Sequence, residues 1–144
     1  MGERRLALIG EQPGGNGPYR PELALTGPTG RNLCAIAGWD WDEYLRADRR
    51  NVFDLRVATW NSSAARKHAL DIAMEVQGTR ILLLGARVAE AFGVLDVPNY
   101  WWTWRRVGYP DLLMARIPHP SGRCRAWNDP SERAWARLFL EGLL

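Results

Sequence analysis

Short apolar segments that alternate with helix-like segments constrain the fold of this chain more than any other feature. Residues 6–9, 81–84 and 112–117 are mainly apolar runs that Gly or Pro closes, and residues 51–55 form a similar, less apolar run. Such runs are typical of strands buried in a parallel sheet. The alternation predicts an α/β protein, a three-layer α/β/α domain with a central, mostly parallel four-stranded sheet.

Helices are predicted between and after these strands, at residues 31–37, 41–46, 62–76, 88–92 and 131–143. Ser62 or Ser63 is the candidate N-cap of the third helix. Its apolar residues recur at helical spacing, and they are Ala65, Ala69, Ile72, Ala73 and Val76. The last helix is expected to dock on the core through Ala134, Trp135, Leu138, Phe139 and Leu143. With 144 residues, the chain is expected to be one domain, residues 1–144.

Two unusual loops leave predicted strands at the same edge of the sheet. The first, Gly10-Glu11-Gln12-Pro13-Gly14, follows the first strand and opens a Gly- and Pro-rich stretch that lasts to residue 30. The second, His119-Pro120-Ser121-Gly122, follows the last strand. Ligands of parallel sheets bind where the strands end, so the two loops are expected to face one another across a common cleft.

Each loop carries one residue suited to chemistry. Glu11 stands close to Gly and Pro at the tip of a strand, where a carboxylate can hold a water molecule, although for this pentapeptide taken alone a solvated turn is the favoured interpretation. His119 lies between two prolines that restrict its backbone, and here the alternative is a structural histidine. His68 follows Arg66 and Lys67 within a helix and is interpreted as a surface residue.

The order of five motifs resembles the uracil-DNA glycosylase superfamily. These motifs are Gly10-Glu11-Gln12-Pro13-Gly14, Gly27-Pro28-Thr29-Gly30, Asn51-Val52, Leu82-Leu83-Leu84-Gly85 with the later Phe92-Gly93, and His119-Pro120-Ser121-Gly122. The resemblance spans residues 6 to about 128. It is closest to the family 4 branch and its covalently trapping relatives, which share the Gly-Glu-x-Pro-Gly pattern.

This resemblance implies a role for each matched residue. Glu11 would orient water or stabilise the sugar cation, His119 would contact the O2 oxygen of the departing base, and Asn51 would read the pyrimidine edge. The base would further be lined by Gly10, Gln12, Pro13, Gly14, Tyr19 and Leu25. Ser121 and Gly122 would lie near the DNA phosphate, with Arg123 and Arg125 as further DNA contacts. The resemblance therefore implies a monofunctional glycosylase that excises uracil or a modified pyrimidine from DNA after flipping it out.

The sequence also departs from the family pattern. Ala24-Leu25 stand where the family has a Pro-Phe pair whose ring stacks on uracil, and Tyr19 or a tryptophan is the candidate substitute. The cysteines of the family 4 iron–sulfur cluster are absent, so no metal and no cofactor are expected, and Cys34 and Cys124 are interpreted as structural. The histidine-bearing insertion of the trapping relatives is not evident, so covalent trapping is not expected.

Two further functions stay open beside the glycosylase. One is a module of the same fold that binds a base, nucleotide or nucleic acid without hydrolysis. The other is a hydrolase of free nucleosides. The formal charge of +3 permits nucleic-acid binding without establishing it. Arginines crowd the last third of the chain, where they suit either a phosphate backbone or a solvated face: Arg105, Arg106, Arg116, Arg123 and Arg125.

The tryptophans at positions 101, 102 and 104 allow two interpretations. Beside Arg105 and Arg106 they suit stacking on unpaired bases. An amphipathic strand, in which Trp102 and Trp104 alternate with Trp101 and Thr103 and one face packs inward, explains the same pattern and is favoured. No apolar run approaches the roughly 20 residues of a membrane span, and the N-terminus is polar. We therefore expect an intracellular, cytoplasmic protein without a membrane partner. The resemblance implies DNA as the partner of a nucleoid-associated protein, and we expect a monomer.

Overall fold

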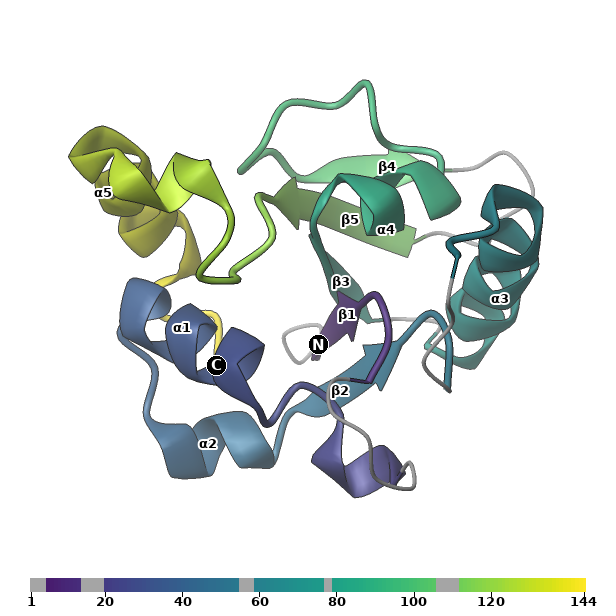
Figure 1. The fold of residues 1–144 in the computed structure, drawn as a ribbon, viewed down its shortest axis with the longest axis horizontal. Coiled ribbons are helices and arrows are strands. Elements are labelled where there is room, and N and C mark those ends of the chain that lie inside the picture. Colours follow the sequence, from purple (N-terminus) through teal and green to yellow (C-terminus); the bar gives the residue numbers. More distant parts are fainter. Residues whose placement is uncertain (1–4, 14–19, 55–58, 77–78, 106–111) are drawn as a thin grey trace.

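A five-stranded sheet forms the centre of the molecule (Figure 1). The computed structural model describes residues 5–13, 20–54, 59–76, 79–105 and 112–144. The strands are β1 (Leu6–Gly10), β2 (Asp48–Asn51), β3 (Arg80–Leu84), β4 (Thr103–Arg105) and β5 (Leu112–Ile117), in the order β2-β1-β3-β5-β4. Strands β2, β1, β3 and β5 are parallel to one another, whereas β4 pairs antiparallel to β5. The sheet is mixed and mostly parallel.

Helices flank the sheet on both faces (Figure 1). On one side lie α3 (Ser62–Glu75) and α4 (Ala86–Ala91), and on the other lie α1 (Pro28–Ala37), α2 (Trp41–Leu45) and α5 (Pro130–Leu140). Two short 3₁₀ helices, η1 (Pro21–Leu23) and η2 (Arg125–Asn128), complete the described elements. The predicted α/β class is confirmed, and the arrangement is compatible with three layers. No helix of the described residues is long and apolar enough to cross a membrane.

The sheet separates two hydrophobic cores because successive side chains of a strand point to opposite faces. In β3, Ile81 and Leu83 join the core beneath α3 and α4, whereas Leu82 and Leu84 join the core beneath α1 and α5. All four side chains are fully buried. The apolar run at 81–84 was therefore correctly predicted as a strand covered on both faces.

The second strand is displaced from its predicted position. Its residues are Asp48–Asn51 and not 51–55, so Asn51 ends the strand instead of starting it. Strand β2 lies at the edge of the sheet, where β1 is its one partner among the described strands, and an edge strand tolerates charged residues. Val52 and Phe53, on which the prediction partly rested, lie in the bend that follows, and Leu55 lies outside the described residues. The sheet also has five strands instead of four, because β4 is formed at residues 103–105.

The face of α5 was predicted correctly only in part: Phe139, and Leu143 just beyond the helix, pack against the core as expected, but the other three predicted residues do not. Ala136 and Leu140 are the residues that it buries, whereas Ala134, Trp135 and Leu138 are exposed. Trp135 and Leu138 expose 65% and 73% of their surface. The helix packs on α1 at the periphery, so a narrow stripe of contact suffices, and Trp135 and Leu138 remain outside it. For α3 the predicted face is confirmed, but Asn61, not Ser62 or Ser63, is its N-cap and accepts a hydrogen bond from the Ala64 amide at 2.9 Å.

Candidate active site at the carboxyl ends of four strands

Four parallel strands each deliver one polar side chain to the same edge of the sheet. Asn51 is the last residue of β2, Glu11 directly follows β1, Arg87 lies in the first turn of α4 after β3, and His119 follows β5. The strand order places them in the sequence Asn51, Glu11, Arg87, His119 across the edge. The two loops singled out in the sequence therefore meet here, as expected.

Glu11 and His119 are in direct contact although β3 separates their strands. The His119 Nε2 atom lies 3.3 Å from Glu11 Oε2, and both side chains are about a quarter exposed, at 27% and 24%. Gly85 makes this approach feasible. A Cβ at Gly85 would lie 3.1 Å from His119 Cβ and 3.2 Å from His119 Cδ2, so the imidazole occupies the space that a side chain after β3 would fill. The φ of +100° at Gly85 also favours glycine.

The backbone of His119 is fixed from several sides. Trp127 donates a hydrogen bond from its indole nitrogen to the His119 carbonyl at 2.8 Å, and Pro118 and Pro120 flank the residue. Burial lowers the pKa of His119 below its ordinary value, and the Glu11 carboxylate opposes this shift. His119 is thus a neutral imidazole at neutral pH, with one N–H donor and one acceptor nitrogen.

Arg87 is a site residue that the sequence analysis missed. Its Nη1 lies 3.5 Å from Glu11 Oε1, so the carboxylate stands between a guanidinium and an imidazole. The guanidinium also lies over the Trp60 ring at 5.7 Å from the centroid. Arg87 is 61% exposed and faces solvent beside the acid. Its position in the first turn after a sheet strand was the signal that could have found it.

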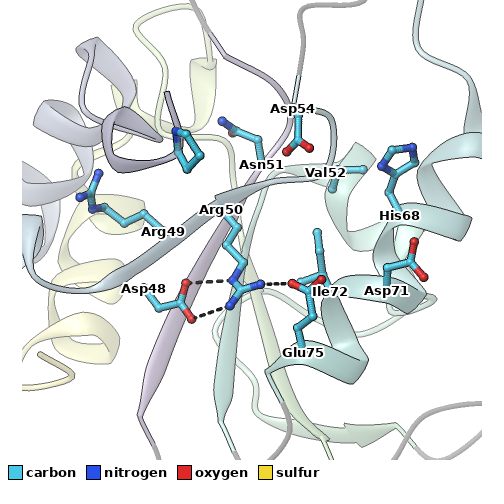
Figure 2. Close-up of a pocket in the computed structure, with 11 residues that line it drawn as sticks. Asp48, Arg49, Arg50, Asn51, Val52, Asp54, His68, Asp71, Ile72 and Glu75 are labelled. Atoms are coloured by element: carbon cyan, nitrogen blue, oxygen red, sulfur yellow. Dashed lines mark hydrogen bonds and ion pairs between the residues drawn. The ribbon is translucent and has the colours of Figure 1, made fainter. Parts of the chain in front are cut away.

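Asn51 is the one buried polar residue of the described core, with 4% of its surface exposed. Its Oδ1 atom is inaccessible and has no hydrogen-bond partner among the described residues. Asn51 also lines a pocket of about 570 Å³ between β2 and α3. Figure 2 shows Asn51 and Asp54 toward one end of this pocket, and the ion pairs of Arg50 with Asp48 and Glu75 toward the other. An unpaired buried acceptor costs about 1–3 kcal/mol. This cost favours a site in which a bound ligand donates a hydrogen bond to the Asn51 oxygen.

The other predicted site residues are placed as follows. Gly10 pairs with Asn51 across β1 and β2, and Leu25 is half-buried against Gly10. Gln12, Pro13 and Ser121 are half-buried at the same edge, whereas Gly122, Arg123 and Arg125 are exposed on the segment that follows His119. Gly14 and Tyr19 lie outside the described residues.

The tryptophans beside β4 do not share one inward face. Trp102 packs on Phe139 with ring centroids 5.4 Å apart, but Trp101 and Trp104 are 64% and 47% exposed. The favoured interpretation placed Trp102 and Trp104 on the same buried face, and it is wrong for Trp104. Arg116 donates to the Val97 carbonyl at 2.6 Å, so its side chain is engaged within the fold, and Arg106 lies outside the described residues.

The two cysteines are unpaired, Cys34 buried and Cys124 half-buried. Burial raises the pKa of the Cys34 thiol to about 11, with a smaller contribution from Asp40 and an opposing one from Arg31. A thiol with so high a pKa is unreactive at neutral pH. In the part of the chain that the structure describes, no three His, Cys, Asp or Glu residues lie together in a way that could hold a metal ion.

The shifted pKa of His119 predicts a pH-dependent stability. The unfolded chain binds the proton more readily than the folded chain. The free energy of unfolding is therefore higher above about pH 6.5, and this gain is lost as the pH falls through the lowered pKa of His119. We expect His119→Gln to abolish this pH dependence of the free energy of unfolding. Urea unfolding between about pH 8 and pH 5 should show wild type losing stability relative to the variant, with His68→Gln as the control for an exposed imidazole. Parallel curves for wild type and His119→Gln would contradict the assignment.

Comparisons with known proteins leave the family open. No protein-family model matches the chain, and a search of curated proteins finds no significant match.

Proposed function

We propose that this protein is a monofunctional DNA glycosylase that hydrolyses the N-glycosidic bond of uracil or a modified pyrimidine. The observation that carries the proposal is the contact between Glu11 and His119 at 3.3 Å, beside a buried asparagine with an unpaired side-chain oxygen. The resemblance of the two loops to the uracil-DNA glycosylase superfamily supports the same assignment. Uracil is the default base of that resemblance.

The chemistry requires one group on each side of the bond. When C1′–N cleaves, the electron pair leaves with the base, so positive charge develops on the sugar and negative charge on the base. Glu11 stabilises the sugar cation and orients the water that adds to C1′, whose released proton passes to the carboxylate or to solvent. His119, as a neutral N–H donor, stabilises the oxygen of the leaving base. A nucleotide that enters the site lies between the two side chains, with Glu11 beside the sugar and His119 beside the base.

DNA fits the charges at the rim of this edge. Arg87, Arg123 and Arg125 are exposed there, and each offers a guanidinium to a backbone phosphate. Flipping a base out of a duplex costs a few kcal/mol, which phosphate contacts must offset.

The test is base excision from oligonucleotides. We expect single- and double-stranded oligonucleotides that contain uracil or a modified pyrimidine to acquire alkali-labile abasic sites, with activity that falls as salt is raised. Oligonucleotides without the lesion are the control. No product on any lesion would overturn the proposal. Equal or higher activity on free nucleosides, independent of salt, would instead indicate a nucleoside hydrolase.

Base binding without hydrolysis is the second candidate. It is favoured by Leu25, because no aromatic side chain stands at this position to stack on a base, and the Leu25 side chain lies against Gly10 beside Asn51. Tight binding of an oligonucleotide or free base with no turnover would support it over the enzyme.

A further inference from the structure

Leu25 has a backbone conformation that L-residues rarely adopt. Its φ is +58°, in the left-handed region, and Leu25 is neither Gly nor Asn, the residues that tolerate this region best. A strained residue persists only where its surroundings hold it in place, and such residues gather at functional sites. The contacts that hold Leu25 therefore indicate what the conformation is for.

Two side chains clamp the turn that carries Leu25. The Tyr44 hydroxyl donates to the Leu25 carbonyl at 2.7 Å, and the Tyr44 ring is fully buried and stacks with Trp41 at 5.3 Å between centroids. Arg49 donates to the carbonyl of Ala24, and also to the carbonyls of Glu22 at 3.1 Å and Leu45 at 2.9 Å. The turn is thus tied to α2 and β2 on both sides of Leu25.

Gly30 supplies the space for this turn. A Cβ on Gly30 would lie only 1.9 Å from the Leu25 carbonyl oxygen and 2.8 Å from the Tyr44 hydroxyl. The glycine in the first turn of α1 therefore lets the Leu25 carbonyl approach the helix. Together with the two clamps, it fixes the backbone of the turn from which the Leu25 side chain extends.

The Leu25 side chain lies against Gly10, the residue of β1 that pairs with Asn51. A Cβ on Gly10 would lie 2.5 Å from Leu25 Cδ2 and 2.9 Å from Asn51 Oδ1, so both atoms lie close to one point at the end of β1. The Asn51 oxygen is inaccessible and lacks a partner among the described residues. The strained leucine and the unpaired amide oxygen thus both border Gly10, and each is unfavourable by itself.

We propose that the Leu25 side chain is a movable cover over the Asn51 amide, displaced when a base enters the site. A base with an N–H donor at its edge, such as the imide of uracil, satisfies the Asn51 oxygen and takes the space of the Leu25 methyl groups. The closed state then competes with the base. The apparent affinity is the affinity of the open state multiplied by the fraction of molecules that are open. This inference rests on the proposed base-binding function.

The experiment compares wild type with Leu25→Ala in two NMR measurements on ¹⁵N-labelled protein. The first is the rate at which the Asn51 side-chain NH₂ exchanges with water, which needs no ligand. The second is a titration with free uracil. We expect faster exchange in the variant and a dissociation constant for uracil about tenfold lower, because the variant no longer has to open. Leu23→Ala, an exposed leucine of η1, is the matched control and should behave as wild type.

Leu25→Gly keeps the test decisive if the alanine variant disturbs the turn, because glycine adopts a positive φ without strain. Unchanged Asn51 exchange in both variants would overturn the cover. Faster exchange with weaker uracil binding would also overturn it, because Leu25 would then be a wall that contacts the bound base. Faster exchange with no uracil binding to any of the proteins would support the cover and contradict the proposed function.

Discussion

Replacing Glu11 with Gln is expected to slow base excision by about a thousandfold under the proposed mechanism. Glutamine keeps the size of the side chain but removes the negative charge that faces the developing sugar cation. The carboxylate is 24% exposed and lies beside Arg87 and His119, so its charge acts in a partly desolvated site. Single-turnover excision from a uracil oligonucleotide measures the step directly, without product release.

The matched control for this substitution is Glu22→Gln. Glu22 is an exposed carboxylate of η1, and its backbone carbonyl accepts a hydrogen bond from Arg49, a contact that the substitution leaves in place. This variant should excise at the wild-type rate. Both proteins should be checked by urea unfolding, so that lost activity is not lost structure. Wild-type excision by Glu11→Gln would remove Glu11 from the mechanism.

The second large effect is expected on stability, in Gly30→Ala. The new Cβ would lie 1.9 Å from the Leu25 carbonyl oxygen, and a backbone atom cannot yield as a flexible side chain does. We expect a loss of about 3 kcal/mol in the free energy of unfolding, at the upper end of overpacking effects. The measurement is urea unfolding followed by tryptophan fluorescence and by circular dichroism.

Gly27→Ala is the control for Gly30→Ala. Gly27 is the N-cap of α1, and a Cβ there would meet nothing within 4 Å. The loss should be about 1 kcal/mol or less, since Ala is a poorer N-cap than Gly. Equal losses in the two variants would mean that the Leu25 turn does not press on α1.

The strands that sequence predicted well are those buried on both faces. Apolar runs closed by Gly10, Gly85 and Pro118 located β1, β3 and β5, because full burial demands a continuous apolar sequence. Strand β2 has the sequence Asp-Arg-Arg-Asn and escaped this signal. Its stability depends on pairing with β1 and on the contacts of Arg49 and Arg50, neither of which shows in local hydropathy.

The candidate site was predictable as two loops but not as one constellation. The parallel order of the strands brings Glu11 and His119 to one edge, which the alternation of strands and helices predicted. The contact between them depends on the missing side chain of Gly85, and a glycine after a strand has many explanations. Arg87 pairs with the Glu11 carboxylate, and Arg49 donates to backbone carbonyls of the Leu25 turn. These partners are distant in the sequence, so no local pattern predicts the contacts.

The edge position of β2 has an evolutionary consequence. Asn51 and the Leu25 turn lie at the margin of the sheet, whereas Glu11 and His119 follow the strands on either side of β3 in its interior. Substitutions of Asn51 or Leu25 need not repack β3 and β5, and they reach Glu11 only as far as Gly10, against which Leu25 lies, transmits them. Under the proposed function, related proteins could therefore differ in the base that they accept while Glu11 and His119 keep the same roles.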